Sequence, residues 1–143
     1  MTELWAGGLG IVTGLLLVLG AVSVHNRMRN RLRDAVVRSR PGAVVIPAFA
    51  EGPLPSALAI AVLGDRIEVW DGGGRHRTTM ALTGATISVQ RVRTGGGSYP
   101  GLRIEQGGDS LSFVPHFAAT VRASDLERAL RELGEDPADH LRP

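Results

Sequence analysis

The chain of 143 residues contains no cysteine and no lysine, and only six aromatic residues. Without cysteine it forms no disulfide, offers no thiolate to a metal and has no thiol nucleophile. The scarcity of aromatic side chains argues against a domain that binds single-stranded nucleic acid, because such domains stack bases on aromatic rings. All sixteen positively charged side chains are arginines.

The positive charge is confined to one short stretch. Residues 25–40 hold six arginines and one acid, Asp34, whereas residues 41–143 hold ten arginines and twelve acids. A nucleic-acid-binding domain carries a basic face on its folded part. The folded part of this chain is slightly acidic, so we expect no nucleic-acid partner.

The sequence also lacks catalytic and cofactor motifs. The four histidines show no metal-ligand spacing, and no nucleophile elbow, P-loop or dinucleotide fingerprint is present. The carboxylates Glu68 and Asp71 are interpreted as solvated groups at a strand end. We therefore predict a protein that is not an enzyme and that holds no metal and no cofactor.

A long apolar run occupies residues 4–24, LWAGGLGIVTGLLLVLGAVSV, without a single charge. As a helix it would span about 30 Å, the thickness of the hydrocarbon layer. A cleavable signal peptide needs a positive start and a shorter core, and the run has neither. We predict an extracytoplasmic N-terminus over residues 1–3 and a transmembrane helix over residues 4–24.

The arginines after this run predict its orientation. Cytoplasmic flanks of membrane helices hold the excess of basic residues, so we expect a single-pass protein of the inner (plasma) membrane. Its N-terminus would lie outside and its C-terminal domain in the cytoplasm. Gly7, Gly10 and Gly14 form a small-residue face that would allow two helices to pack as a homodimer. The alternative is that glycine is common in membrane helices.

Residues 25–40 are predicted to form a basic juxtamembrane helix. Met28, Leu32 and Val36 recur every fourth residue and form one stripe. Either this stripe lies on the bilayer with arginines on anionic headgroups, or the helix is a solvated extension. The arginines concerned are Arg27, Arg29, Arg31 and Arg33. Pro41 and Gly42 are expected to end the helix.

Seven short strand-like segments follow, separated by turns rich in glycine. They read GAVVIPAF, SALAIAVL, RIEVW, RTTMAL, ATISVQRV, GLRIEQ and SLSFVP. Their alternation and spacing predict a small antiparallel barrel or sandwich. Pro47, Pro53 and Pro55 leave the first two strands in doubt.

A helix is predicted over residues 124–133. Ser124 as N-cap and Glu127 three residues later form a capping-box pattern, and Leu126, Leu130 and Leu133 form an apolar stripe. Gly134 suits the left-handed position after a helix. Residues 135–143 are expected to be a polar tail.

Seven strands closed by one C-terminal amphipathic helix resemble the pleckstrin-homology-like fold of many small bacterial membrane proteins. The residues that carry the resemblance are GDRIEVWDGGGRHRTTMAL, ATISVQRV, YPGLRIEQGGDSLSFVP and the capped helix. The expected fold class is mainly β (α+β): a transmembrane helix followed by a seven-stranded antiparallel domain over residues 41–134. A barrel of the oligonucleotide-binding type is the main alternative.

The resemblance implies a binding or scaffolding module. We expect a membrane-anchored domain facing the cytoplasm that binds a partner protein at the membrane. The alternative is binding of an anionic lipid headgroup, for which Arg75 and Arg77 are candidates beside the juxtamembrane arginines, because they share one face of a strand.

Overall fold

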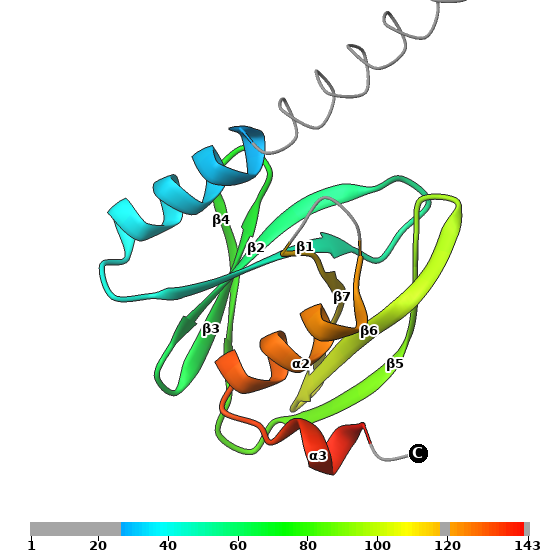
Figure 1. The fold of residues 1–143 in the computed structure, drawn as a ribbon. Coiled ribbons are helices and arrows are strands. Elements are labelled where there is room, and N and C mark those ends of the chain that lie inside the picture. Colours follow the sequence, from blue (N-terminus) through cyan, green and yellow to red (C-terminus); the bar gives the residue numbers. More distant parts are fainter. Residues whose placement is uncertain (1–26, 118–120, 142–143) are drawn as a thin grey trace, which may run out of the picture.

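The structure is a computed structural model in which residues 27–117 and 121–141 are described. Seven antiparallel strands form one sheet in the order β4-β3-β2-β1-β7-β6-β5 (Figure 1). The strands are β1 (Val44–Ala50), β2 (Ser56–Leu63), β3 (Arg66–Asp71), β4 (His76–Ala81), β5 (Thr86–Thr94), β6 (Gly97–Gln106) and β7 (Asp109–Pro115). All neighbours along the chain pair as hairpins except β4 and β5, which form the two edges of the sheet.

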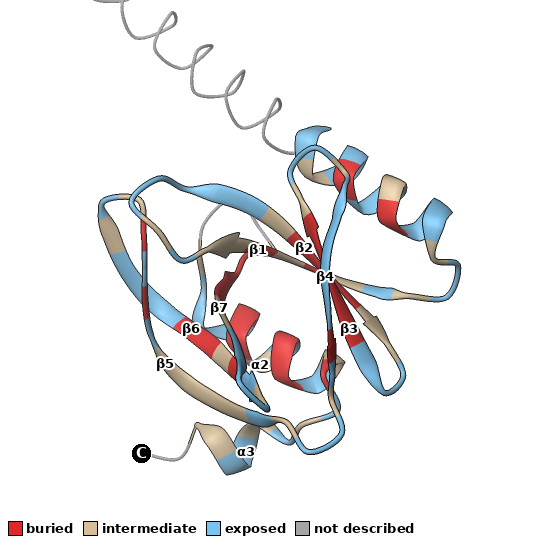
Figure 2. Cartoon of the chain, turned by 180° about the vertical axis from the view of Figure 1, so that it is seen from behind, coloured by how far each residue is buried: buried red, intermediate tan, exposed pale blue. Residues whose placement is uncertain are grey.

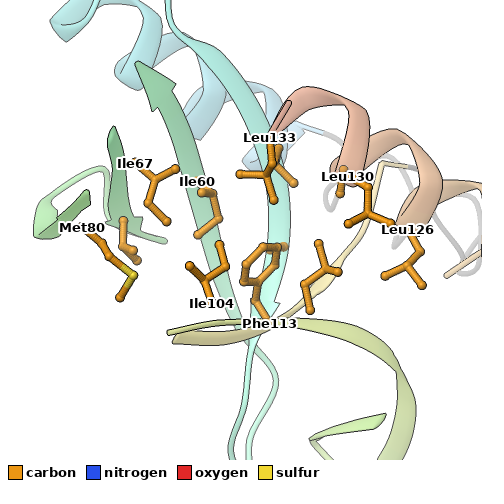
Figure 3. Packing of buried hydrophobic residues seen from close by; sticks show 13 residues of the cluster. Ile60, Ile67, Met80, Ile104, Phe113, Leu126, Leu130 and Leu133 are labelled. Carbon is orange, nitrogen blue, oxygen red and sulfur yellow. The ribbon is translucent and has the colours of Figure 1, made fainter. Parts of the chain in front are cut away.

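The sheet curls into an open half-barrel around helix α2 (Ala123–Glu132) (Figure 1). Strand alternation places Ile60 of β2, Ile104 of β6 and Phe113 of β7 on the inner face, where all three are fully buried. Figure 3 shows these side chains pointing toward Leu126, Leu130 and Leu133 of α2. The alternative of a five-stranded oligonucleotide-binding-type barrel is wrong, because this sheet has seven strands and stays open between its edges.

The proline in β1 is accommodated by the way the sheet is built. Val44–Ala50 pairs with β2 along its whole length, but β7 pairs only with Ala48–Ala50. Pro47 lies where this second ladder begins, and its carbonyl accepts a hydrogen bond from the amide of His116 at 2.8 Å. Because a proline lacks only the amide donor, Pro47 fits this position and β1 forms. Pro53 and Pro55 lie in the connection before β2, and that strand forms as well.

The cap of α2 differs from the predicted capping box. The helix begins at Ala123, and Arg122 is its N-cap. The Asp125 carboxylate accepts the Arg122 amide at 2.9 Å, whereas Glu127 pairs with Arg131 at 3.4 Å. The box is therefore shifted by two residues, because a helix starting at Ala123 places Asp125 at the third position. Gly134 adopts φ 81° as expected.

The expected polar tail is partly folded. Asp136 accepts the amide of Ala138 at 2.9 Å and begins the short helix α3 (Pro137–His140). His140 lies 3.1 Å from Glu135, and Leu141 packs against the main core. The composition of the tail concealed these contacts, which place α3 next to α2.

The expected fold class is corrected in one respect, since it included a transmembrane helix. Among residues 27–117 and 121–141 no helix is long and apolar enough to cross a membrane. The described helical segment, residues 27–39, is about 20 Å long and rich in arginine. The described fold is thus a seven-stranded sheet with short helices. The apolar run at 4–24, on which that prediction rested, lies outside the described residues, as do Gly7, Gly10 and Gly14.

Candidate binding groove beside the basic helix

The helix over residues 27–39, named the basic helix below, packs on the outer face of the sheet. Leu32 is 7% exposed and Val36 fully buried, and both contact the cluster of Ala59, Ala61 and Trp70. Alanines on β2 leave room for the helix to approach. Both alternatives for its apolar stripe, a bilayer contact and a solvated extension, are therefore wrong for these two residues. Met28, the third member, is 62% exposed.

A buried carboxylate anchors the C-terminal end of the basic helix. Glu68 of β3 accepts Arg40 Nε at 3.1 and 3.0 Å and Trp70 Nε1 at 3.3 Å. Burial raises the pKa of Glu68, but the hydrogen bond and charge of Arg40, joined by the Trp70 bond, outweigh it and leave the pKa lowered. The interpretation of Glu68 as a solvated group was wrong, because the side chain is only 4% exposed.

The sequence contained a signal for this burial. Glu68 and Trp70 alternate with Ile67 and Val69, so both face away from the α2 core. A large aromatic residue on the outer face of a sheet indicates that something covers that face. In Figure 2 the basic helix is exposed apart from narrow buried and intermediate bands, so most of its surface remains on the outside.

A groove of about 520 Å³ lies between the N-terminal half of the basic helix and the outer face of β1 and β2. Its floor is apolar: Pro47 and Phe49 from β1, and Ala57 and Ala59 from β2. Val45, Pro47 and Phe49 stand opposite Ala61, Ala59 and Ala57 in the β1–β2 ladder. Since alanine is small, this row forms a depression that the basic helix covers only in part.

The remaining lining comes from the helix and from the end of β7. Met28 and Leu32 form one wall of the groove, and Arg29 and Arg33 add positive charge along this wall. His116 closes the end near β7, where its ring lies 4.6 Å from that of Phe49. The groove is therefore an apolar depression with positive charge along one wall.

The first four arginines of the basic helix divide into two rows, although they occupy alternate positions in the sequence. A helix turns about 100° per residue, so Arg27 and Arg31 share one side and Arg29 and Arg33 another. Arg27 and Arg31 are exposed and point away from the buried stripe. Arg29 and Arg33 flank the sheet, and Arg29 Nη1 donates to the carbonyl of Phe117 at 2.8 Å.

Arg75 and Arg77 have different environments. Asp71 accepts the amides of Gly73 and Arg75 at 2.9 and 3.1 Å, and Arg77 Nε at 2.6 Å. The hydrogen bond from the Arg75 amide, with the bonds of Arg77 and Gly73, lowers the pKa of Asp71 despite some desolvation. The carboxylate thus closes the β3–β4 turn and neutralises Arg77. Arg75 is exposed at the same turn.

Each histidine in the described part of the chain contacts another side chain of the domain. His76 lies 2.9 Å from the hydroxyl of Thr79, and His116 and His140 have the neighbours given above. Within the described ranges, no group of three or more histidine, aspartate or glutamate side chains is placed to hold a metal ion.

No family model, curated protein or solved structure matches the chain. The pleckstrin-homology-like resemblance stays a prediction, with which the half-barrel and its C-terminal helix are compatible.

Proposed function

We propose that the protein is a non-catalytic binding module whose groove takes an apolar segment of a partner protein. The observation that carries this proposal is the incompletely covered outer face of β1 and β2, where Pro47, Phe49 and Ala57 line a depression of about 520 Å³. Pockets that bind ligands commonly measure about 300–1,000 Å³ and are mostly apolar with a few polar groups.

Charge indicates what kind of segment fits. Arg29 and Arg33 stand along one wall of the groove, and no described residue forms an ion pair with Arg33. A segment with an acidic residue beside its apolar side chains would place opposite charge next to this wall. The partner is therefore expected to present apolar and acidic residues together.

Headgroup binding by Arg75 and Arg77, the alternative from the sequence, receives less support. Arg77 is already paired with Asp71 at 2.6 Å, so only Arg75 of the two is available to a ligand. The proposed function therefore rests on the groove and not on the β3–β4 turn.

Filling the groove tests the proposal. Peptides selected by display on the full-length protein are expected to be apolar and acidic, with Kd values of about 10 μM. Ala57 is exposed on the groove floor, and Ala57→Trp puts an indole there. Since the ring occupies the space of the ligand, we expect fluorescence anisotropy to show at least tenfold weaker binding.

Ala81→Trp is the matched control, because Ala81 is an exposed strand residue of β4 outside the groove. It should leave the affinity for the same peptides unchanged. Equal binding of the selected peptides to both variants, or a selection that yields no binder, would contradict the proposed function.

A further inference from the structure

A second pocket, of about 390 Å³, lies between the basic helix and α2 and is named the arginine pocket here. Arg29 and Arg33 reach it from the basic helix, and Arg128 reaches it from α2. One carboxylate, that of Glu132, is also part of the lining. Three guanidinium groups and one carboxylate give the arginine pocket a formal charge of +2.

Two of the three arginines are held in place by the protein. Arg29 donates to the Phe117 carbonyl at 2.8 Å, and the Arg128 guanidinium lies 4.2 Å from the centre of the Phe117 ring. Phe117 thus positions guanidinium groups from two elements that are about 100 residues apart in sequence. Because these side chains are already held in place, less conformational entropy is lost when a ligand binds.

Two of the three guanidinium groups in the pocket have no carboxylate partner in the described part of the chain. The side chains of Arg33 and Arg128 form no hydrogen bond or ion pair with another described residue. Arg29 and Arg33 are also one helical turn apart, a spacing at which like charges repel. Such convergence is slightly unfavourable, and an anion between the guanidinium groups would relieve it.

The sheet contributes a further polar group at this place. Residues 44–47 of β1 pair with β2 only, so none of the described strands covers their other edge. The carbonyl of Pro47 points to the β7 side, where it accepts the His116 amide. By strand alternation the amide of Val45, which lines the pocket, points to that same side. Backbone amides at an open edge are ready donors to an anion.

We infer that the arginine pocket is a binding site for a phosphate-type anion. A phosphate monoester carries a charge of about −2 at neutral pH and three acceptor oxygens. This charge is equal and opposite to that of the pocket. One guanidinium group can donate two parallel hydrogen bonds to a phosphate, which makes arginine the preferred residue for such sites. The volume leaves room for the group attached to the phosphate.

The arginine pocket shares Arg29 and Arg33 with the groove, but the inference does not require a peptide in the groove, and direct titration tests it. Adding inorganic phosphate to the full-length protein at constant ionic strength should shift the Val45 amide resonance saturably, with Kd about 1 mM. Arg33→Gln and Arg128→Gln should each weaken binding at least tenfold. The matched controls are Arg31→Gln on the basic helix and Arg131→Gln on α2, both outside the pocket, and they should change Kd less than twofold.

A second arm identifies the source of the phosphate. Sedimentation with phosphatidylcholine vesicles, with and without phosphatidic acid, whose headgroup is a phosphate monoester, is compared for the same variants. Vesicle binding that needs Arg33 and Arg128 and is displaced by inorganic phosphate would identify a lipid headgroup. Phosphate binding without vesicle binding would identify a soluble phosphate ester.

Two results would overturn the inference. One is the absence of a saturable shift up to about 20 mM phosphate, since a built site for a dianion should reach millimolar affinity. The other is an equal loss of binding in Arg31→Gln and Arg33→Gln, which would mean that general positive charge and not the pocket attracts the anion.

Discussion

The substitution Glu68→Gln is expected to lower the free energy of unfolding by about 2 kcal/mol at pH 7. It removes the charge that accepts Arg40 Nε at 3.0 Å, in a side chain that is only 4% exposed. Loss of a buried ion-pair partner costs about 3–5 kcal/mol. The loss is expected to be smaller here, because water can solvate the half-exposed Arg40. Urea denaturation measures the difference.

The effect should depend on pH in one direction. The pKa of Glu68 in the folded state lies below its ordinary value of 4.5. A carboxyl with a depressed pKa stabilises the fold fully above its unfolded pKa, and this stabilisation disappears as the pH falls through the folded pKa. The difference between the wild-type protein and Glu68→Gln should therefore be constant above about pH 6 and shrink below about pH 4.

Glu105→Gln is the matched control for this experiment. Glu105 pairs with Arg103 on β6, but its side chain is 51% exposed. Exposed ion pairs contribute about 0–1 kcal/mol, so this variant should unfold close to the wild-type protein. Equal stabilities of Glu68→Gln and Glu105→Gln at pH 7 would contradict the anchoring role of Glu68.

Gly101→Ala is expected to lower the free energy of unfolding by about 3 kcal/mol and Tm by roughly 10 °C. Gly101 is buried in β6, where a Cβ atom would lie 2.6 Å from the Phe113 carbonyl oxygen and 2.6 Å from Val92 Cγ2. Both neighbours are fully buried, and one contact is to backbone. The clash can be relieved only by moving β6 away from its neighbours. Calorimetry of the full-length protein measures the change.

The same substitution at Gly108 separates this clash from a general effect of alanine. Gly108 lies in the β6–β7 turn with no atom within 4 Å of an added Cβ. Gly108→Ala should change the free energy of unfolding by less than about 0.5 kcal/mol. If Gly101→Ala were as stable as Gly108→Ala, the close approach of β6 and β7 would be wrong.

The strands of the sheet could be predicted because each leaves a local pattern. Apolar residues alternate in β3, β6 and β7, and glycine turns separate the hairpins. The basic helix was also predicted, with its end at Pro41 and Gly42. These features depend on neighbours in sequence, which a single chain shows directly.

The groove and the arginine pocket could not be predicted in this way. Both depend on where the basic helix docks, and the stripe of Leu32 and Val36 is equally suited to a bilayer, another protein or a sheet. The partner surface consists of Ala59 and Ala61 from β2 and Trp70 from β3, and nothing in the sequence joins these two strand segments to the basic helix. Likewise, Arg29 and Arg128 both contact Phe117. These contacts join distant segments, so no sequence pattern predicts them.

The docking of the basic helix on the outer face of the sheet is the central claim, because both candidate sites depend on it. Nuclear Overhauser effects in the full-length protein test it most directly, since packed side chains lie within about 4.5 Å of one another. Cross-peaks should join the methyl groups of Val36 to the indole of Trp70 and to the methyl groups of Ala59 and Ala61, residues that form one buried cluster. A Val36 that showed no cross-peak to β2 or β3, with methyl groups broadened by a soluble paramagnetic agent, would contradict the account.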